Sequence, residues 1–402
     1  MGKEFNIMEE LKNKIQTAVE SHLEQAVKLS RELAEHPELP YEEFESSRKM
    51  VEILRNAGFQ VTYPYAGYET AYCAEFDNGD GPSVAFLAEY DALPEIGHGC
   101  GHNLHGSLSV LTGLAMKTLK DEFKGKIYVI GTPAEEENGA KIGMADQGIF
   151  DNIDLAVMMH SNPGGYCVTD MDVLSLRCYV VEFFGETAHA VAAPWDGKSA
   201  LAAGRKFLDL IDARRECFTP DIHVNAVILD GGKAPNIIPD YCKIRMEFRT
   251  ASMARLLKVD EMVKKCADAA AMALDCNVKL SFGLSDFADM VRTLPLEEEI
   301  STLMKEYGMK VKEVPPAAGS SDVGNVSYRC PSLQALLSIT DKPLALHTRA
   351  FRDATLEPEA NIAMEKGASS LVSLALKVLN DDSFRQEVHD AWQQELKRKH
   401  SE

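Results

Sequence analysis

The chain has 402 residues, of which 45% are apolar and 26% charged, and this composition predicts a globular protein with room for two domains. Its formal net charge of -20 argues against nucleic-acid binding by phosphate neutralisation and against binding to an anionic membrane surface. No apolar run reaches the length of a transmembrane helix.

Nine cysteines are scattered along the chain without the paired spacing of a disulfide framework. An odd number of scattered cysteines in a long chain indicates reduced thiols in a reducing compartment. The first residues, MGKEFNIMEELKNK, lack the apolar core of a signal peptide. We therefore expect a cytoplasmic protein.

The first 160 residues predict helices and strands in alternation. Helical periodicity covers residues 8–34, 42–57 and 104–119, and strand-like apolar runs cover 59–63, 70–75, 84–88, 126–132 and 155–159. Repeated strand–helix–strand units predict a mostly parallel sheet with helices on its faces. In such sheets ligands bind beyond the carboxyl ends of the strands.

The pattern changes near residue 174. Strands are predicted at 174–184, 223–229, 241–249 and 277–282, with helices at 197–218 and 253–274, which is the β-α-β-β-α-β order of the ferredoxin-like unit. The first pattern resumes after residue 287, with a strand at 333–339 and a helix at 357–379. We therefore predict an α/β catalytic domain, residues 1–173 and 287–402, with a ferredoxin-like domain, residues 174–286, inserted into it.

Polar side chains gather around the predicted strand at 84–88. Glu89 and Asp91 follow that strand, and Cys100 and His102 stand in the sequence G-C-G-H. Alternate residues of an extended segment point to one side, so Cys100 and His102 can face the same point. This mixture of sulfur, nitrogen and oxygen suits Zn²⁺, whereas Mn²⁺ would depend more on the carboxylates. The alternative is a polar loop with a buried free cysteine.

Two further predicted strands end in the same kind of residue. Glu135 and Glu136 follow the strand at 126–132, and His160 follows the strand at 155–159. The convergence of three strand ends favours a metal site, although Glu135 and Glu136 also fit a solvated acidic turn and His160 a core histidine. His347, in the loop L-H-T, completes a possible ligand set without a spacing that singles it out. Its rivals are His36, His98 and His105.

Adjacent glutamates can divide two tasks. In an extended segment neighbouring side chains diverge, so one of Glu135 and Glu136 can bind a metal while the other reaches a water molecule. A metal lowers the pKa of bound water, and a carboxylate can pass the proton of that water to a leaving amine. Two metals sharing a bridge need about five ligands, and the candidates are Cys100, His102, Glu136, His160 and His347.

The inserted domain has three candidate substrate-binding residues. His189 follows a predicted strand in GETAHA, Asn236 lies in GGKAPNIIPD, and Arg249 ends a strand. An imidazole, an amide and a guanidinium can hold a carbonyl and a carboxylate. The alternatives are a turn histidine, an asparagine that caps a turn and a surface arginine.

Together these motifs carry a family resemblance. The stretches are AEYDALPEIGHGCGHN, PAEEENG, MMHSNP, GETAHAVAAPWDG, GGKAPNIIPD, GSSDVGNVS and LHTRAFRDA. In this order they resemble the metallopeptidase-twenty amidohydrolases, and they cover nearly the whole chain. The branch most similar to them holds p-aminobenzoyl-glutamate hydrolases, indole-acetyl-amino-acid hydrolases and hippurate-type aminoacylases.

The resemblance implies two divalent metal ions, Mn²⁺ or Zn²⁺, in the α/β domain, and a smaller lid domain that dimerises. It implies hydrolysis of an amide bond next to a free carboxylate, with Glu135 as general base and Cys100 as the bridging ligand. His189 matches the lid histidine that reaches the neighbouring subunit's site to polarise the scissile carbonyl, and Asn236 and Arg249 match substrate-binding positions. The implied metal ligands are Cys100, His102, Glu136, His160 and His347.

Two departures from the family pattern concern the substrate. Asn103 stands where this branch often has Asp, and Glu137-Asn138 replaces a pair of glycines. Neither departure removes a predicted metal ligand, and both leave the identity of the substrate undetermined.

The sequence therefore predicts a cytoplasmic, metal-dependent amidohydrolase that cleaves an N-acyl or N-aminoacyl amino acid resembling p-aminobenzoyl-glutamate. We expect a small-molecule substrate, no nucleic-acid or membrane partner, and a homodimer through the lid or a higher oligomer. The alternatives are a dipeptidase or carboxypeptidase on the same fold and an inactive, metal-bearing partner subunit of a heteromer.

Overall fold

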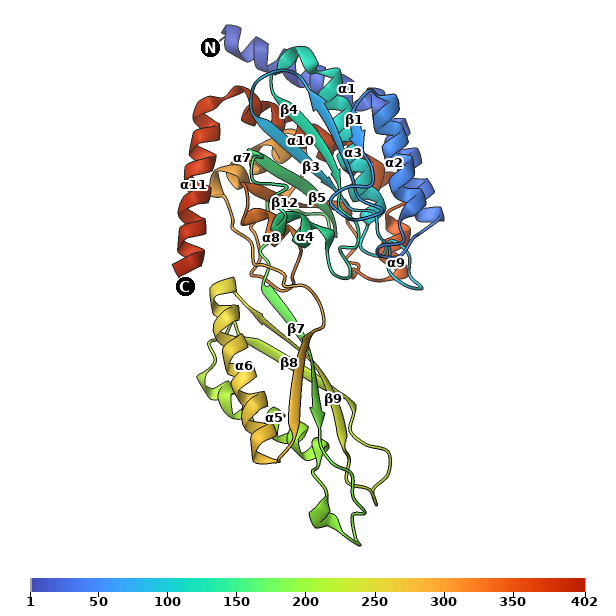
Figure 1. Ribbon diagram of the computed structural model, residues 1–402. Coiled ribbons are helices and arrows are strands. Elements are labelled where there is room, and N and C mark those ends of the chain that lie inside the picture. Colours follow the sequence, from blue (N-terminus) through green and yellow to red (C-terminus); the bar gives the residue numbers. More distant parts are fainter. Residues whose placement is uncertain (1, 402) are drawn as a thin grey trace. The chain divides into compact units, whose positions relative to one another are not determined.

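A computed structural model describes residues 2–401 (Figure 1). These residues form two compact units. The first comprises residues 2–172, 290–317 and 321–397, and the second comprises residues 173–289, 318–320 and 398–401. Most of the second unit, residues 173–289, is thus one continuous insertion in the chain of the first.

An eight-stranded sheet forms the centre of the first unit, in the order β1-β2-β4-β3-β5-β12-β6-β11. The strands are β1 (Gln60–Thr62), β2 (Tyr72–Asp77), β3 (Ser83–Ala88), β4 (Lys126–Gly131), β5 (Leu155–Pro163), β6 (Cys167–Val168), β11 (Val311–Lys312) and β12 (Ser332–Thr340). The neighbours β4, β3, β5 and β12 pair in parallel, whereas β1 and β2 add an antiparallel edge.

The parallel centre explains the apolar runs in the sequence. Every residue of β3 is buried, because helices cover both faces of a parallel sheet and leave no face for polar side chains. Parallel strands also bring their carboxyl ends to one edge, where β3, β4 and β5 lie next to each other.

Long helices cover this sheet. The helices of the first unit are α1 (Gly2–Glu35), α2 (Phe44–Asn56), α3 (His102–Thr118), α4 (Ala140–Asp146), α7 (Leu294–Glu306), α8 (Val323–Ser327), α9 (Arg349–Ala354), α10 (Pro358–Asn380) and α11 (Asp382–Ser401). Both α1 and α10 pack against α3, which is almost wholly buried, and α4 packs against α8. No helix among residues 2–401 has the length and apolar character needed to cross a membrane.

The second unit is an antiparallel sheet with two helices. In chain order it runs β7 (Ser175–Phe184), α5 (Ala200–Arg214), β8 (His223–Asp230), β9 (Tyr241–Thr250), α6 (Met253–Ala273) and β10 (Asn277–Phe282). The sheet order is β10-β7-β9-β8, and its core packs side chains of both helices against the strands. This is the ferredoxin-like arrangement, so the predicted fold class, an α/β domain with an inserted βαββαβ domain, is confirmed.

Some local features differ from the sequence prediction. The sequence pattern did not single out the short elements β6, β11, α4 and α8, because two to seven residues are too few to show a period. Strand β5 continues to Pro163, so His160 lies within the strand, opposite Leu336 of β12, and not in the loop after it.

Candidate functional site

Gly101 determines how the chain enters the site. Its φ is +89°, and a Cβ atom there would lie 2.7 Å from Ser161, so only glycine fits. Helix α3 begins at the next residue, His102, and Cys100 precedes the turn. The expectation of an extended segment is therefore wrong, but the turn brings the two side chains to the same place by a different route.

The five predicted ligands form overlapping sets. The ligand atoms of Cys100, His102 and His160 lie within 4.8 Å of one another, and so do those of Cys100, Glu136 and His347. Cys100 Sγ lies 3.4 Å from His160 Nε2 and 3.5 Å from His347 Nε2. Because Cys100 belongs to both sets, its sulfur lies between two possible metal positions.

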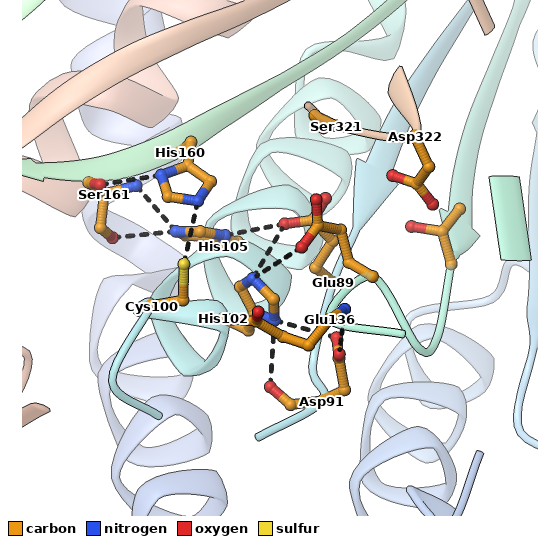
Figure 2. Close-up of polar contacts among 12 residues, drawn as sticks. Glu89, Asp91, Cys100, His102, His105, Glu136, His160, Ser161, Ser321 and Asp322 are labelled. Carbon is orange, nitrogen blue, oxygen red and sulfur yellow. Dashed lines mark hydrogen bonds and ion pairs between the residues drawn. The ribbon is translucent and has the colours of Figure 1, made fainter. Parts of the chain in front are cut away.

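Hydrogen bonds orient the ring nitrogens toward this centre (Figure 2). His102 Nδ1 lies 2.9 Å from Asp91 Oδ1, and His160 Nδ1 lies 2.8 Å from the carbonyl oxygen of Ser161. Since each Nδ1–H donates to an oxygen, each Nε2 faces the centre and carries the lone pair when the ring is neutral. Metal-binding histidines are held by carboxylates or carbonyls in this way.

Two atoms of the site are buried without a hydrogen bond. Among the described residues, His102 Nε2 and Glu136 Oε1 have no hydrogen-bond partner. Buried polar atoms are nearly always bonded, so an acceptor nitrogen and a carboxylate oxygen left open side by side indicate a missing ligand. A sulfur, imidazole and carboxylate donor set fits a divalent transition metal.

The electrostatics of the site also favour a cation. Burial lowers the pKa of His102, but the carboxylates of Asp91 and Glu89 outweigh it and raise that pKa well above its usual value. Burial raises the pKa of the Cys100 thiol to about 12, so its thiolate needs a positive charge beside it.

Glu135 lies at the edge of the cluster. Its carboxylate oxygen Oε2 is 3.9 Å from His102 Nε2, and its side chain is only 12% exposed. Burial, followed by the charges of Glu89 and Asp322, raises the pKa of Glu135 well above its usual value. A carboxylate in such surroundings takes up a proton readily.

A buried lysine balances these carboxylates. Lys141 Nζ lies 2.7 Å from Glu89 Oε1 and 2.7 Å from Asp322 Oδ1, and all three side chains are fully buried. Burial lowers the pKa of Lys141, but Asp322, Glu89 and Glu135 raise it above its usual value. Lys141 was not predicted, because no local sequence pattern separates a buried lysine at the start of a short helix from a surface one.

Two alternative histidines, His105 and His98, do not provide ring nitrogens free to bind a metal alongside the five predicted ligands. His105 is fully bonded, because Ser161 N–H donates to its Nε2 at 2.7 Å and its Nδ1 lies 3.0 Å from Glu89 Oε2. His98 is buried and belongs to no cluster of ligand-type residues in the described chain. His347 lies close to Cys100, as the family resemblance implied and as no spacing in the sequence indicated.

The remaining candidates lie in the second unit. His189 is exposed, and its Nδ1 accepts the N–H groups of Val191 at 3.2 Å and Ala192 at 3.1 Å. Asn236 lies beside it, since the Asn236 carbonyl accepts the Ala190 N–H. Arg249 is near the other end of the sheet, where β9 pairs with the start of β7, so the structure does not bring it to His189.

Comparison with known proteins decides the family. The sequence pattern described as Peptidase family M20/M25/M40 matches residues 85–365. The chain belongs to this family. Its predicted resemblance is confirmed, and this M20 protein is a metal-dependent hydrolase of amide or peptide bonds.

Three relatives illustrate the match. The M20 chain is 31% identical to the Xaa-Arg dipeptidase of Mus musculus, with 92% of this chain and 90% of that protein aligned. It is 28% identical to a subunit of the p-aminobenzoyl-glutamate hydrolase of Escherichia coli, with 68% of this chain and 61% of that protein aligned. A solved Bacillus subtilis structure, a dinuclear metal binding peptidase from the M20 family, superposes with a TM-score of 0.70 at 19% identity, covering 90% of this chain and 99% of that one.

We predict that Lys141→Met lowers the free energy of unfolding by about 3–5 kcal/mol, because two buried carboxylates lose their counter-charge. Urea unfolding followed by the fluorescence of Trp392, which is buried in the first unit, measures the change. The control is Lys126→Met, since Lys126 pairs with Glu75 at a surface where such pairs contribute about 0–1 kcal/mol. Equal losses in the two variants would contradict the prediction.

Proposed function

We propose that this M20 hydrolase cleaves the amide bond of an N-aminoacyl or N-acyl amino acid, with Glu135 as general base beside a two-metal centre. The observation that carries the proposal is the pair of ligand sets sharing Cys100, with the largely buried carboxylate of Glu135 at their edge. A binding protein would have no use for Glu135 in that position.

Cys100, His102, Glu136, His160 and His347 would hold the metal ions, and Cys100 is the residue that belongs to both ligand sets. The donor set suits Zn²⁺ or Mn²⁺, and the name of the Bacillus subtilis structure, a dinuclear metal binding peptidase, supports two ions. Bound divalent ions would polarise the scissile carbonyl and lower the pKa of water at the site.

Glu135 moves the proton of the reaction. Its carboxylate accepts a proton from the attacking water and then passes it to the nitrogen of the leaving amine. Its raised pKa favours the first transfer, and its closeness to His102 keeps it near the reacting atoms.

Residues 174–286 are proposed as the lid and dimerisation domain, and residues 1–173 and 287–402 as the catalytic domain. In the lid, His189 Nδ1 accepts hydrogen bonds from two backbone N–H groups, so Nδ1 carries no proton and the ring N–H is at Nε2. That N–H can donate to the substrate carbonyl oxygen as negative charge develops there. Asn236 and Arg249 are proposed to bind the substrate, Arg249 through a carboxylate.

The relatives point to two substrate classes. The Xaa-Arg dipeptidase, aligned over nearly the whole chain, supports a dipeptide, and the p-aminobenzoyl-glutamate hydrolase supports an acyl amino acid. We favour the dipeptide, since the alignment is longer and the identity higher. A carboxypeptidase on the same fold is the alternative.

Glu135→Gln is expected to lower kcat by about 10²–10⁴-fold, because an amide cannot accept the proton of water. Metal content, measured by inductively coupled plasma mass spectrometry, stays that of the wild type. Glu137→Gln, two positions along and exposed, is the matched control and keeps its activity. A fully active Glu135→Gln enzyme with metal bound would refute the assignment.

A substrate panel decides the specificity. Protein loaded with Zn²⁺ or Mn²⁺ is incubated with Xaa-Arg and other dipeptides, longer peptides, N-acyl amino acids and p-aminobenzoyl-glutamate, and mass spectrometry identifies the products. We expect dipeptides to release two free amino acids, with Glu135→Gln as the blank. Cleavage of acyl amino acids alone would instead assign an aminoacylase, and cleavage of none would refute the proposed substrate classes.

A homodimer in the cytoplasm is the proposed form of the enzyme. Strand β8 is an edge of the second unit's sheet and exposes Val227, Ile228 and Leu229 by 56%, 43% and 55%. An exposed apolar edge strand readily pairs with another chain. All nine cysteines are free thiols, as a reducing compartment permits.

We expect Val227→Lys to convert the dimer to a monomer, because it places a charge on the pairing edge. Light scattering coupled to size-exclusion chromatography measures the mass. Met272→Lys introduces the same charge on helix α6, where Met272 is 79% exposed, and leaves the mass unchanged. A wild-type monomer would refute the proposal.

A further inference from the structure

Two buried carboxylates hold the loop between β4 and α4 on either side of Glu135. The Ala134 N–H donates to Glu43 Oε1 at 2.9 Å, and the Glu136 N–H donates to Asp91 Oδ2 at 3.0 Å. Asp91 also orients His102. Glu43, unlike Asp91, does not orient a predicted metal ligand, and the sequence motifs give it no role.

Ala134 is the strained point of this loop. Its φ is +62°, a conformation that residues with a Cβ rarely adopt, and it is fully buried. Its carbonyl accepts the N–H groups of Glu137 at 3.2 Å and Gly139 at 2.8 Å, which makes the turn tight. Such a conformation persists only where the surroundings hold it.

Glu43 is not used as a helix cap, although it immediately precedes α2. Its side chain makes no capping hydrogen bond. Glu38 does that work, because its carboxylate accepts the N–H groups of Glu45 at 3.0 Å and Ser46 at 2.8 Å. Glu43 is therefore free to reach a segment 91 residues away in the sequence.

The second oxygen of Glu43 is held as well. Thr70 Oγ1 donates to Glu43 Oε2 at 2.9 Å, and Glu43 is fully buried. Burial, followed by the charge of Asp91, raises the pKa of the Glu43 carboxyl to about 7, although hydrogen bonds oppose this. An oxygen of the group can accept the Ala134 N–H in either protonation state.

We propose that Glu43 is a positioning residue, which holds Ala134 in its left-handed conformation and so fixes the directions of Glu135 and Glu136. The role of Glu135 in this proposal rests on the proposed function, whereas the role of Glu43 rests on its hydrogen bond to Ala134 and on the conformation of that residue. A carboxylate that served only the stability of the core would affect unfolding and leave the reaction unchanged.

The first test removes the acceptor. Glu43→Leu is expected to lower kcat by about 10²-fold with KM changed less than threefold, since a small displacement of a catalytic group costs about that much. Glu43→Gln keeps an acceptor oxygen and retains activity within about threefold. Thr70→Val, the matched control, removes the hydrogen bond from Thr70 to Glu43 Oε2, leaves the Ala134 contact intact and also retains activity. An equal kcat loss in Thr70→Val and Glu43→Leu would overturn the proposal.

The second test is a rescue. Ala134→Gly in the Glu43→Leu background is expected to restore kcat at least tenfold, because glycine adopts a positive φ without strain. Ala134→Gly alone changes kcat less than threefold. A double variant no more active than Glu43→Leu would overturn the proposal. If Glu43→Leu does not fold, Glu43→Met, with its flexible unbranched side chain, replaces it in the same comparison.

The third test does not depend on activity. Hydrogen–deuterium exchange of the metal-free protein, read on a peptide covering residues 133–139, is expected to be faster in Glu43→Leu than in the wild type or Thr70→Val. Unchanged exchange would overturn the proposal. A wild-type protein that hydrolyses no substrate of the panel would refute the proposed function instead. The exchange comparison would then still test the role of Glu43.

Discussion

Buried negative charge is the constraint on which the site depends. Glu89 and Asp91 follow β3 into the interior, and Glu135 and Asp322 lie close to Glu89. Uncompensated carboxylates at this depth would cost several kcal/mol each. The positive charge of Lys141 balances the carboxylates of Glu89 and Asp322. His102 Nε2 and Glu136 Oε1 have no hydrogen-bond partner, and a bound cation would supply the balancing charge there.

The sheet makes this concentration of charge possible. Because β3, β4 and β5 run in parallel, the loops after β3 and β4 emerge at one edge, and His160 lies towards the same end of β5. The apolar strands behind that edge supply the burial that raises the pKa values of Cys100 and Glu135. The same packing that stabilises the sheet thus makes a thiolate at Cys100 depend on a positive charge beside it.

Backbone conformation then aims the side chains. Gly101 turns the chain so that His102 can begin α3. Ala134 turns it just before Glu135 and Glu136, whose carboxylate oxygens both lie within 4.8 Å of a ring nitrogen of His102. His347 also has a positive φ, of 59°, and its N–H donates to the Gly99 carbonyl at 2.9 Å. Three strained or glycine-dependent turns therefore surround one centre, as is common where function requires a geometry that local preference opposes.

The sequence by itself determined the alternation of helices and strands, the inserted βαββαβ unit and the chemical types of the ligands, because these depend on period and composition over short windows. Only the tertiary structure decided that His347 lies beside Cys100, 247 residues away, that Lys141 is buried between two carboxylates, and that Glu43 holds the loop of Glu135. Contacts between residues far apart in the chain leave no local pattern. They exist because packing the sheet and its helices brings those side chains to one edge.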